Sequence, residues 1–445
     1  MDSSYAALLG HRSLMALQGE EWKMMRQRLN PAFSKGHLIS LMPCILEHIS
    51  PFLECLDGYC RSGADFPLQD PLAELTLGIM GSIVMNGNNN DSSEISRQHE
   101  ITSVFRELYS TYSFDPNVPS WLTDPRAKWR RNQVGKKLTS LLQDTIRKVA
   151  DRMNRVPAKG SPPINSRNII ALALADVENL TTETLDLVCD QLKFLLFAGF
   201  DTTIYLLGWL IYQLSITPRA LKSVQDELES IFGPGTDPTI AKEKLLSSPA
   251  DTLSCMRYTS SLIKETLRMY PPGATSRTVP SNSDAFLQMP DGSALRLDGL
   301  SLYSCHSMIH REEAVYGATK DVFMPERWLH PVDSSGVGTR VPPAAWRPFE
   351  RGPRNCLGQE LALVVSKLVL VFAARRYNFC KSGLGQVARD ASNEPILNPH
   401  GQYEVESELY YARQFIPKPV DRMRMHVQFS SVTHSSECVQ KLCLF

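Results

Sequence analysis

Apolar residues recur at three- and four-residue steps along much of this chain, which is the spacing of one buried face of an α-helix. The pattern predicts long helices over residues 38–55, 93–109, 128–155, 183–214 and 359–377. No internal repeat or low-complexity tract interrupts them. The chain is therefore predicted to be mainly helical.

The pattern changes after residue 280. Segments 285–289 and 295–302 flank the sequence PDGS, which is typical of a β-hairpin with a tight turn. Prolines and polar residues then dominate residues 317–346, which predicts an irregular meander. The fold class is accordingly mainly α with a small β part, in one body over residues 1–429, followed by a polar tail at 430–445.

The most apolar long window covers residues 192–214. A stretch of about 20 apolar residues is long enough to cross a bilayer. Lys193 and Asp201 lie inside it, however, and a charged residue at the centre of a membrane helix costs about 2.5–3.5 kcal/mol. A buried core helix that carries one functional acid explains this window better.

Composition adds few constraints. Lys plus Arg and Asp plus Glu number 47 each among the 445 residues, so no net charge argues for a nucleic-acid partner. Ten scattered cysteines without a CxxC pair indicate a reduced compartment rather than a disulfide framework. His306 and His310 are spaced one helical turn apart, which is more typical of a packed or solvated pair than of a zinc site.

One cysteine stands in an unusual place. In the segment WRPFERGPRNCLGQELALVVSK, Cys356 lies between Gly352 and Gly358 and directly before an apolar run. A helix from about residue 357 would point free N–H groups at the sulfur and lower the pKa of the thiol. Such a thiolate suits a nucleophile or a soft metal ligand. Taken alone, these residues fit a buried structural cysteine equally well.

Four further stretches set polar or charged groups beside apolar ones. They are Trp22 and Arg26 one turn apart, AGFDTT at 198–203 inside the most apolar helix, Glu265 and Arg268 at a spacing of three, and the PERW sequence that contains Arg327. A polar trio in a buried helix costs desolvation free energy, so a function is the better explanation for it.

Together these stretches resemble the cytochrome P-450 family of haem-thiolate monooxygenases, from about Gly19 to at least Tyr377. The FxxGxRxCxG pattern is formed by Phe349, Gly352, Arg354, Cys356 and Gly358. The sequences FERGPRNCLGQELA and PERW are similar to those of the filamentous-fungal branch of the family, which tailors secondary metabolites.

The resemblance implies that Cys356 is the axial thiolate of a haem b iron, where its electron donation favours O–O cleavage. Phe349 would pack near the sulfur, and backbone N–H groups that follow Cys356, around Gly358, would tune the iron. The haem propionates would be bound by Trp22, Arg26, Arg277 and Arg354.

The resemblance also assigns roles away from the cysteine. Asp201 and Thr202 would deliver the protons that oxygen activation consumes, and Ala198 or Gly199 would let the helix approach closely. A buried structural triad would consist of Glu265, Arg268 and Arg327. An apolar substrate would be lined by Phe194, Phe197, Ala198, Ala274 and Thr275.

As partners, the resemblance implies O2, an apolar small molecule and an NADPH–cytochrome P-450 reductase that meets Arg347, Arg351 and Lys367. The chain would act as a monomer on the cytosolic face of the endoplasmic reticulum membrane. Two departures stand out. Glu350 occupies a position where many members carry a small residue, and only about twenty residues precede Trp22. The second departure implies a member that lacks the N-terminal anchor, the early helices and part of the sheet.

Three interpretations remain open at this stage. The first is a reductase-dependent monooxygenase, which the intact Asp201–Thr202 pair favours. The second is a haem-thiolate isomerase or dehydratase that acts on a peroxide without external electrons. The third is a non-catalytic, truncated haem-binding fragment.

Overall fold

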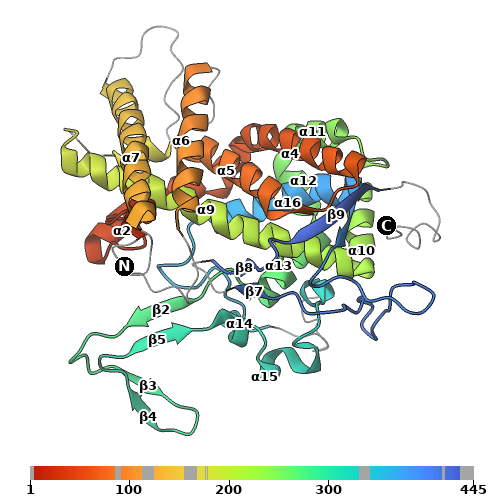
Figure 1. The fold of residues 1–445 in the computed structure, drawn as a ribbon. Coiled ribbons are helices and arrows are strands. Elements are labelled where there is room, and N and C mark those ends of the chain that lie inside the picture. The colour runs from red at the N-terminus through yellow and green to blue at the C-terminus, as the bar shows by residue number, and fades with distance from the viewer. Residues whose placement is uncertain are drawn as a thin grey trace. The chain divides into compact units, whose positions relative to one another are not determined.

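A computed structural model describes residues 5–85, 92–112, 125–154, 168–175, 177, 179–329, 341–412 and 416–430. Helices dominate and the strands are short and antiparallel (Figure 1). This confirms the predicted fold class. Apart from Ser430, the predicted polar tail lies outside the described residues.

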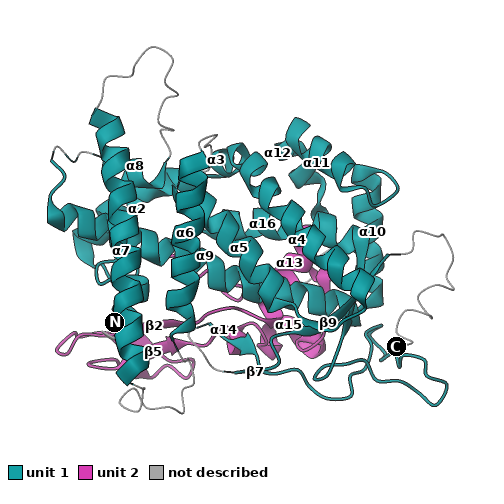
Figure 2. Cartoon of the chain, turned by 45° about the horizontal axis from the view of Figure 1, so that its top comes forward, with its two compact units in different colours: residues 1–259, 357–445 teal, residues 260–356 magenta. Residues whose placement is uncertain are grey.

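The chain divides into two compact units (Figure 2). Unit 1 comprises Met1–Thr259 and Leu357–Phe445, and unit 2 comprises Ser260–Cys356. The single body expected over residues 1–429 stays a prediction, and the two units are described separately below.

Unit 1 holds most of the helices. They are α1 (Ala6–Leu9), α2 (Gly19–Leu29), η2 (Asn30–Phe33), α3 (Lys35–Ser40), α4 (Met42–Ser62), α5 (Gln69–Met85), α6 (Ser92–Ser110), α7 (Pro125–Asn154), α8 (Ile169–Ala173), α9 (Thr182–Ile216), α10 (Pro218–Phe232), α11 (Pro238–Ser247), α12 (Pro249–Cys255) and α16 (Gln359–Arg376). The long predicted helices correspond to α4, α6, α7, α9 and α16.

Helix α9 is the core element of unit 1. Its N-terminus is capped by the Thr181 hydroxyl, which accepts from the N–H of Thr184 at 3.2 Å. The helix is long and apolar enough to cross a membrane, but 78% of its most apolar window is buried inside this structure. The core-helix interpretation is therefore confirmed. The helix also continues unbroken through the polar trio at 201–203.

The predicted helix over 38–55 is divided in two. Helix α3 ends at Ser40 and α4 begins at Met42, next to a proline in the first turn of α4. A proline lacks an N–H and fits the first turn of a helix, so it favours a new start there. Helix α4 ends at Gly63, which adopts φ +65°.

A three-stranded antiparallel sheet completes unit 1. Strand β9 (Arg424–Phe429) lies between β1 (Phe66–Pro67) and β6 (Tyr377–Lys381). Phe66 pairs with Met425, and Tyr377 pairs with Phe429. A two-stranded hairpin of β7 (Tyr411–Ala412) and β8 (Lys418–Pro419) precedes β9 and carries Lys418.

Unit 2 contains most of α13 (Arg257–Met269), the short helices α14 (His306–Ile309), α15 (Glu313–Tyr316), η4 (Gly317–Thr319) and η5 (Pro325–Trp328), and two strand pairs. Strand β2 (Thr275–Thr278) pairs with β5 (Ser301–Ser304), and β3 (Phe286–Gln288) pairs with β4 (Ala294–Arg296).

The predicted hairpin forms, but the prediction of one strand over 295–302 is wrong. The N–H of Leu300 donates to the carbonyl of Leu297 at 2.9 Å, and Gly299 adopts φ +68°. This turn ends β4, and the following strand β5 pairs with β2 instead of β3.

Candidate active site

The cysteine loop of unit 2 is held in a tight turn. The N–H of Cys356 donates to the carbonyl of Phe349 at 2.8 Å, and the N–H of Asn355 donates to the carbonyl of Gly352 at 3.1 Å. Gly352 adopts φ +83°, which a side chain would strain. The thiol of Cys356 is exposed. Helix α16 begins at Gln359, where the apolar pattern predicted it, with Gly358 at its N-cap.

Two arginines that were predicted to bind haem lie near each other in this unit. Burial lowers the pKa of Arg354, and the nearby cation of Arg277 lowers it further. Arg277 itself donates to the carbonyl of Ser276 at 2.8 Å. Two guanidinium groups this near each other form a site that fits an anion. A propionate is such an anion, so these residues fit a haem.

Glu265 and Arg268 form a fully buried ion pair on α13. Arg268 Nε donates to Glu265 Oε2 at 2.9 Å, and Arg268 Nη2 donates to Glu265 Oε1 at 2.8 Å. Arg327 Nε lies 3.6 Å from Glu265 Oε1, while its Nη2 donates to Thr319. The three side chains predicted as a structural triad therefore gather in one place.

This buried pair also holds the meander of unit 2. Arg268 donates to the backbone carbonyls of His310 and Val322, each at 3.0 Å. In return, Glu265 accepts from the N–H of Met324 at 3.0 Å. The irregular segment has few ladder hydrogen bonds of its own, so a bidentate guanidinium is well suited to fix it.

Aromatic rings connect the buried pair with the cysteine loop. The indole N–H of Trp328 donates to Glu265 Oε2 at 2.8 Å. Trp328 packs against Trp346 at 5.9 Å between ring centroids, and Trp346 packs against Phe349 at 6.3 Å. Phe349 is thus linked to Glu265 through the rings of Trp346 and Trp328.

Glu350, the departure noted in the sequence, adopts φ +58°, and three other side chains form hydrogen bonds with its carboxylate. Arg347 Nε donates to it at 2.8 Å, and His306 Nε2 lies 3.1 Å from its carboxylate. Burial alone would raise the pKa of Glu350, but hydrogen bonds from Thr275, Arg347 and His306 outweigh burial and bring the pKa to about 2. The side-chain contacts offset the unfavourable backbone angle.

His310 lies behind His306, with ring centroids 5.9 Å apart. It donates from Nδ1 to the carbonyl of Arg268 and accepts at Nε2 from the N–H of Arg347. Burial, aided by His306, lowers the pKa of His310 to about 4, so the ring is neutral. The two histidines form a packed pair, and the described residues hold no group of three His, Cys, Asp or Glu suited to a metal.

In unit 1, α9 leaves one face partly open in its otherwise buried middle. Phe194, Ala198 and Thr202 are partly exposed and four residues apart, so they lie on one face of the helix. Phe197, also predicted to line a substrate site, is 3% exposed and packs beside Tyr109. The two remaining lining candidates belong to unit 2, where Ala274 is exposed and Thr275 starts β2.

Gly199 has a packing role. A Cβ atom at this position would lie 2.2 Å from Sδ and 2.9 Å from Cγ of Met80 on α5. The glycine therefore lets α5 and α9 approach each other. The sequence argument assigned it to close approach toward oxygen, and it overlooked this contact between helices.

Asp201 is a deeply buried acid in the middle of α9, at 1% exposure. Its Oδ1 accepts from the Tyr109 hydroxyl at 2.9 Å and lies 3.0 Å from Lys418 Nζ. Its Oδ2 has no hydrogen-bond partner among the described residues. Burial raises the pKa of Asp201, while the charge of Lys418 and hydrogen bonds from Lys418 and Tyr109 oppose that rise.

The hydroxyl of Thr202 donates to the carbonyl of Ala198 at 2.6 Å, which leaves its oxygen able to accept. Trp22 and Arg26 lie one turn apart on α2 and are both partly exposed. With Asp201 and Gly358 they belong to unit 1, whereas Arg277, Phe349, Arg354 and Cys356 belong to unit 2.

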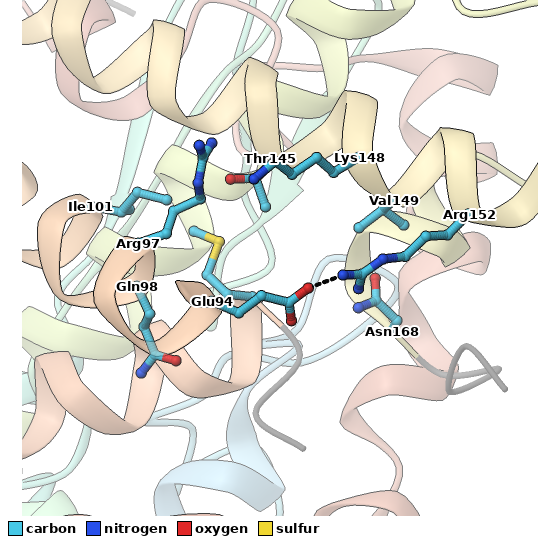
Figure 3. A pocket seen from close by; sticks show the side chains of 10 residues that line it. Glu94, Arg97, Gln98, Ile101, Thr145, Lys148, Val149, Arg152 and Asn168 are labelled. Carbon is cyan, nitrogen blue, oxygen red and sulfur yellow. Dashed lines mark hydrogen bonds and ion pairs between the residues drawn. The ribbon is translucent and has the colours of Figure 1, made fainter. Parts of the chain in front are cut away.

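A separate pocket lies among α5, α6, α7 and α8 (Figure 3). Basic side chains from α6 and α7 line it, namely Arg97, Lys148 and Arg152, and Arg152 forms an ion pair with Glu94. None of the residues predicted for the active site lines it. This pocket is therefore not the candidate site.

Comparison with known proteins identifies the class. Residues 4–406 match the family model described as Cytochrome P450. Because this match covers most of the chain, the chain belongs to the cytochrome P450 family, whose members bind haem through a cysteine thiolate.

Similar curated proteins come from fungi and plants. The chain is 28% identical over 386 residues to cytochrome P450 monooxygenase polC of Polytolypa hystricis, covering 83% of this chain and 65% of that protein. It is 26% identical over 391 residues to cytochrome P450 monooxygenase acrF of Aspergillus aculeatus, covering 84% and 75%. A cytokinin hydroxylase of Arabidopsis thaliana is 24% identical over 377 residues, covering 83% and 67%.

Proposed function

We propose that this chain is a haem-thiolate monooxygenase that uses O2 and electrons from NADPH, passed on by a reductase, to hydroxylate, epoxidise or desaturate an apolar small molecule. The observation that carries the proposal is the cysteine loop. It presents an exposed thiol at Cys356 in the same unit as the neighbouring cations of Arg277 and Arg354.

Each side chain has a distinct task in holding the haem. Cys356 would supply the thiolate, and Arg277 and Arg354 would bind a propionate. Trp22 and Arg26 of unit 1 would each serve as a further propionate ligand. The arginine fork meets a carboxylate with two parallel hydrogen bonds, which fixes orientation as well as charge. When bound, the haem supplies oxygen activation with electron donation from the thiolate.

The face of α9 formed by Phe194, Ala198 and Thr202 supplies the substrate side. Its apolar side chains exclude water and favour an apolar substrate. Asp201 holds a proton at its carboxyl group, and the Thr202 oxygen accepts and passes it on. The presence of both groups supports oxygen activation over a peroxide rearrangement that needs no proton delivery.

The names of the fungal relatives support the monooxygenase reaction class. The resemblance of FERGPRNCLGQELA and PERW to the filamentous-fungal branch supports a role in secondary metabolism, and family members in eukaryotes support a location at the endoplasmic reticulum membrane. Among the residues expected to meet the reductase, Arg347 is bonded to Glu350 and Lys367 donates to the carbonyl of Leu253. Arg351 is exposed and therefore the best-placed contact of the three.

The first experiment is spectroscopic. The protein is expressed with haem supplied, reduced and exposed to carbon monoxide. A strongly red-shifted Soret band is expected for the wild type, because only a thiolate ligand produces it. Cys356→Ser should lose this band, whereas Cys255→Ser, which changes another exposed cysteine, should keep it. An unchanged band in Cys356→Ser contradicts the proposal.

The second experiment tests the reaction class. Apolar candidate substrates are offered with NADPH and a reductase, or with a peroxide substrate and no electron donor. Oxidised product that depends on NADPH supports the monooxygenase. Product formed from the peroxide alone supports the isomerase or dehydratase instead. A thiolate spectrum with neither product supports a non-catalytic haem-binding chain.

A further inference from the structure

Three side chains from distant parts of the sequence meet within unit 1. Tyr109 stands near the end of α6, Asp201 lies in the middle of α9, and Lys418 begins β8 (Figure 1). Lys418 Nζ donates to the Tyr109 hydroxyl and lies 3.0 Å from Asp201 Oδ1, while Tyr109 donates to the same Oδ1 at 2.9 Å. Lys418 also lies over the Tyr109 ring, 4.6 Å from its centroid.

The two charged ends of this series differ in exposure. The Lys418 side chain is 19% exposed, and the Asp201 side chain is 1% exposed. The lysine side chain therefore reaches water, and the carboxylate does not. The ammonium group contacts Asp201 Oδ1 directly, and the Tyr109 hydroxyl accepts from Lys418 and donates to the same oxygen, so it holds the two groups in line for proton transfer.

The second carboxylate oxygen of Asp201, Oδ2, indicates the direction of proton transfer. Oδ1 accepts both incoming hydrogen bonds, whereas Oδ2 is buried without a partner among the residues the structure covers. A buried carboxylate oxygen without a partner is costly, so a structure that only stabilised this acid would be expected to satisfy both oxygens. Oδ2 is therefore the oxygen from which a proton would leave Asp201.

We propose that Lys418 and Tyr109 form the route by which protons enter from solvent to Asp201. This inference rests on the proposed function, in which Asp201 delivers protons for oxygen activation. Both residues act through Asp201 and touch neither substrate nor haem in the proposal, so they are positioning residues rather than catalytic ones.

The transfer balances without electrons. One N–H bond of the Lys418 ammonium breaks as an O–H bond forms on Asp201 Oδ1, 3.0 Å away. Lys418 is left as a neutral amine and takes a proton from the solvent. A half-turn of the carboxyl group then brings the new proton to the side of Oδ2. Burial and the charge of Asp201 raise the pKa of Tyr109 far above its usual value, so Tyr109 keeps its own proton and orients the pair.

A purely structural role makes different predictions at the lysine. Arginine keeps the positive charge and the ion pair but does not give up its proton at any pH that a protein survives. Lys418→Arg should therefore preserve folding and still block the route. Tyr109→Phe keeps the ring packed near Phe197 and Phe200 and removes only the hydroxyl.

The test follows the proton itself, without turnover. The infrared band of the protonated Asp201 carboxyl is assigned by its absence in Asp201→Asn. The protein is then mixed rapidly into D2O at the pH of half-protonation of each variant, and the shift of that band gives the exchange rate. Exchange should slow on the order of 10²-fold in Lys418→Arg, at the lower end of what one positioned proton donor contributes, and by less in Tyr109→Phe, which loses only the hydroxyl that orients Lys418 toward Asp201.

Two matched variants serve as controls. Tyr112→Phe removes another buried hydroxyl just beyond α6, and Lys381→Arg alters another buried lysine–aspartate pair, that of Lys381 and Asp421. Both should exchange at the wild-type rate. Wild-type exchange in Lys418→Arg, in folded protein with a normal carbon-monoxide spectrum, overturns the route and leaves the proposed function intact. Slowed exchange in a protein without the thiolate spectrum overturns the proposed function and leaves the route standing.

Discussion

The backbone N–H of Cys356 donates to the carbonyl of Phe349 at 2.8 Å, which closes the cysteine loop of unit 2. The same Phe349 packs against Trp346, and Trp346 packs against Trp328, whose indole N–H binds Glu265. The position of the thiol is therefore tied through aromatic rings to a fully buried ion pair.

Loss of the Glu265 charge should destabilise unit 2 strongly. In Glu265→Gln, Arg268 is left as a buried cation without its counter-ion, and breaking such a pair costs about 3–5 kcal/mol. Urea unfolding followed by tryptophan fluorescence measures this loss. As a control, Glu313→Gln removes an exposed partner of Lys320 and should leave the midpoint unchanged. Equal midpoints for both variants would contradict the structural role of the buried pair.

Haem retention should depend on the neighbouring cations of Arg277 and Arg354. Arg277→Gln and Arg354→Gln each remove a charge-assisted hydrogen bond worth about 1.5–3 kcal/mol, so haem should bind roughly 10- to 10²-fold more weakly. The measurement is a haem titration of the apoprotein. Arg351→Gln should bind haem normally, because Arg351 donates to the carbonyl of Pro343. Normal haem affinity in both of the first two variants would exclude them from propionate binding.

Gly199→Ala should destabilise unit 1 through its contact with Met80. Overpacking costs about 1–3 kcal/mol, and the better helix propensity of alanine returns only about 1 kcal/mol. Thermal unfolding should show a lower midpoint, and the loss should shrink in a Met80→Ala background, where the space is free. Gly58→Ala in α4, where a Cβ meets no atom within 4 Å, should instead be neutral or stabilising. A stabilising Gly199→Ala would disprove the close contact.

Glu350 should stabilise the fold in a pH-dependent way. Its pKa in the folded state, about 2, lies below its ordinary value of 4.5. The unfolded chain therefore takes up a proton first as the pH falls, and the stabilisation disappears between these two values. The difference in unfolding free energy between wild type and Glu350→Gln should be constant above about pH 5 and shrink toward pH 2. A difference that stays constant down to pH 2 would count against the hydrogen bonds that Glu350 forms with Thr275, Arg347 and His306.

The sequence was sufficient for elements that rest on a local pattern. The apolar pattern predicted α6, α7, α9 and α16. Helices α6 and α7 bury one side along their length, whereas α9 and α16 are buried on most sides. The strand predicted over 295–302 is interrupted at Asp298–Gly299. An Asp–Gly dipeptide marks a turn, so the sequence itself held the signal against one continuous strand.

The candidate site shows the limit of local patterns. Asp201 was found because an acid in an apolar helix needs an explanation. Its partners Tyr109 and Lys418 were missed because they come from other segments and carry no motif. Only the folded chain places them at one carboxylate oxygen. The contact of Gly199 with Met80 was missed for the same reason, since Met80 lies on another helix.

The central place of β9 in the sheet of unit 1 has a consequence for how the protein forms. Strand β9 pairs on one side with β6 and on the other with β1, near residue 66. A ribosome must therefore have made nearly all of the described chain before the first strand finds its neighbour. Contacts so distant in sequence are slow to form. Until then the nascent chain carries β1 unpaired and Asp201 without its lysine, and a chaperone is well suited to protect it during that interval.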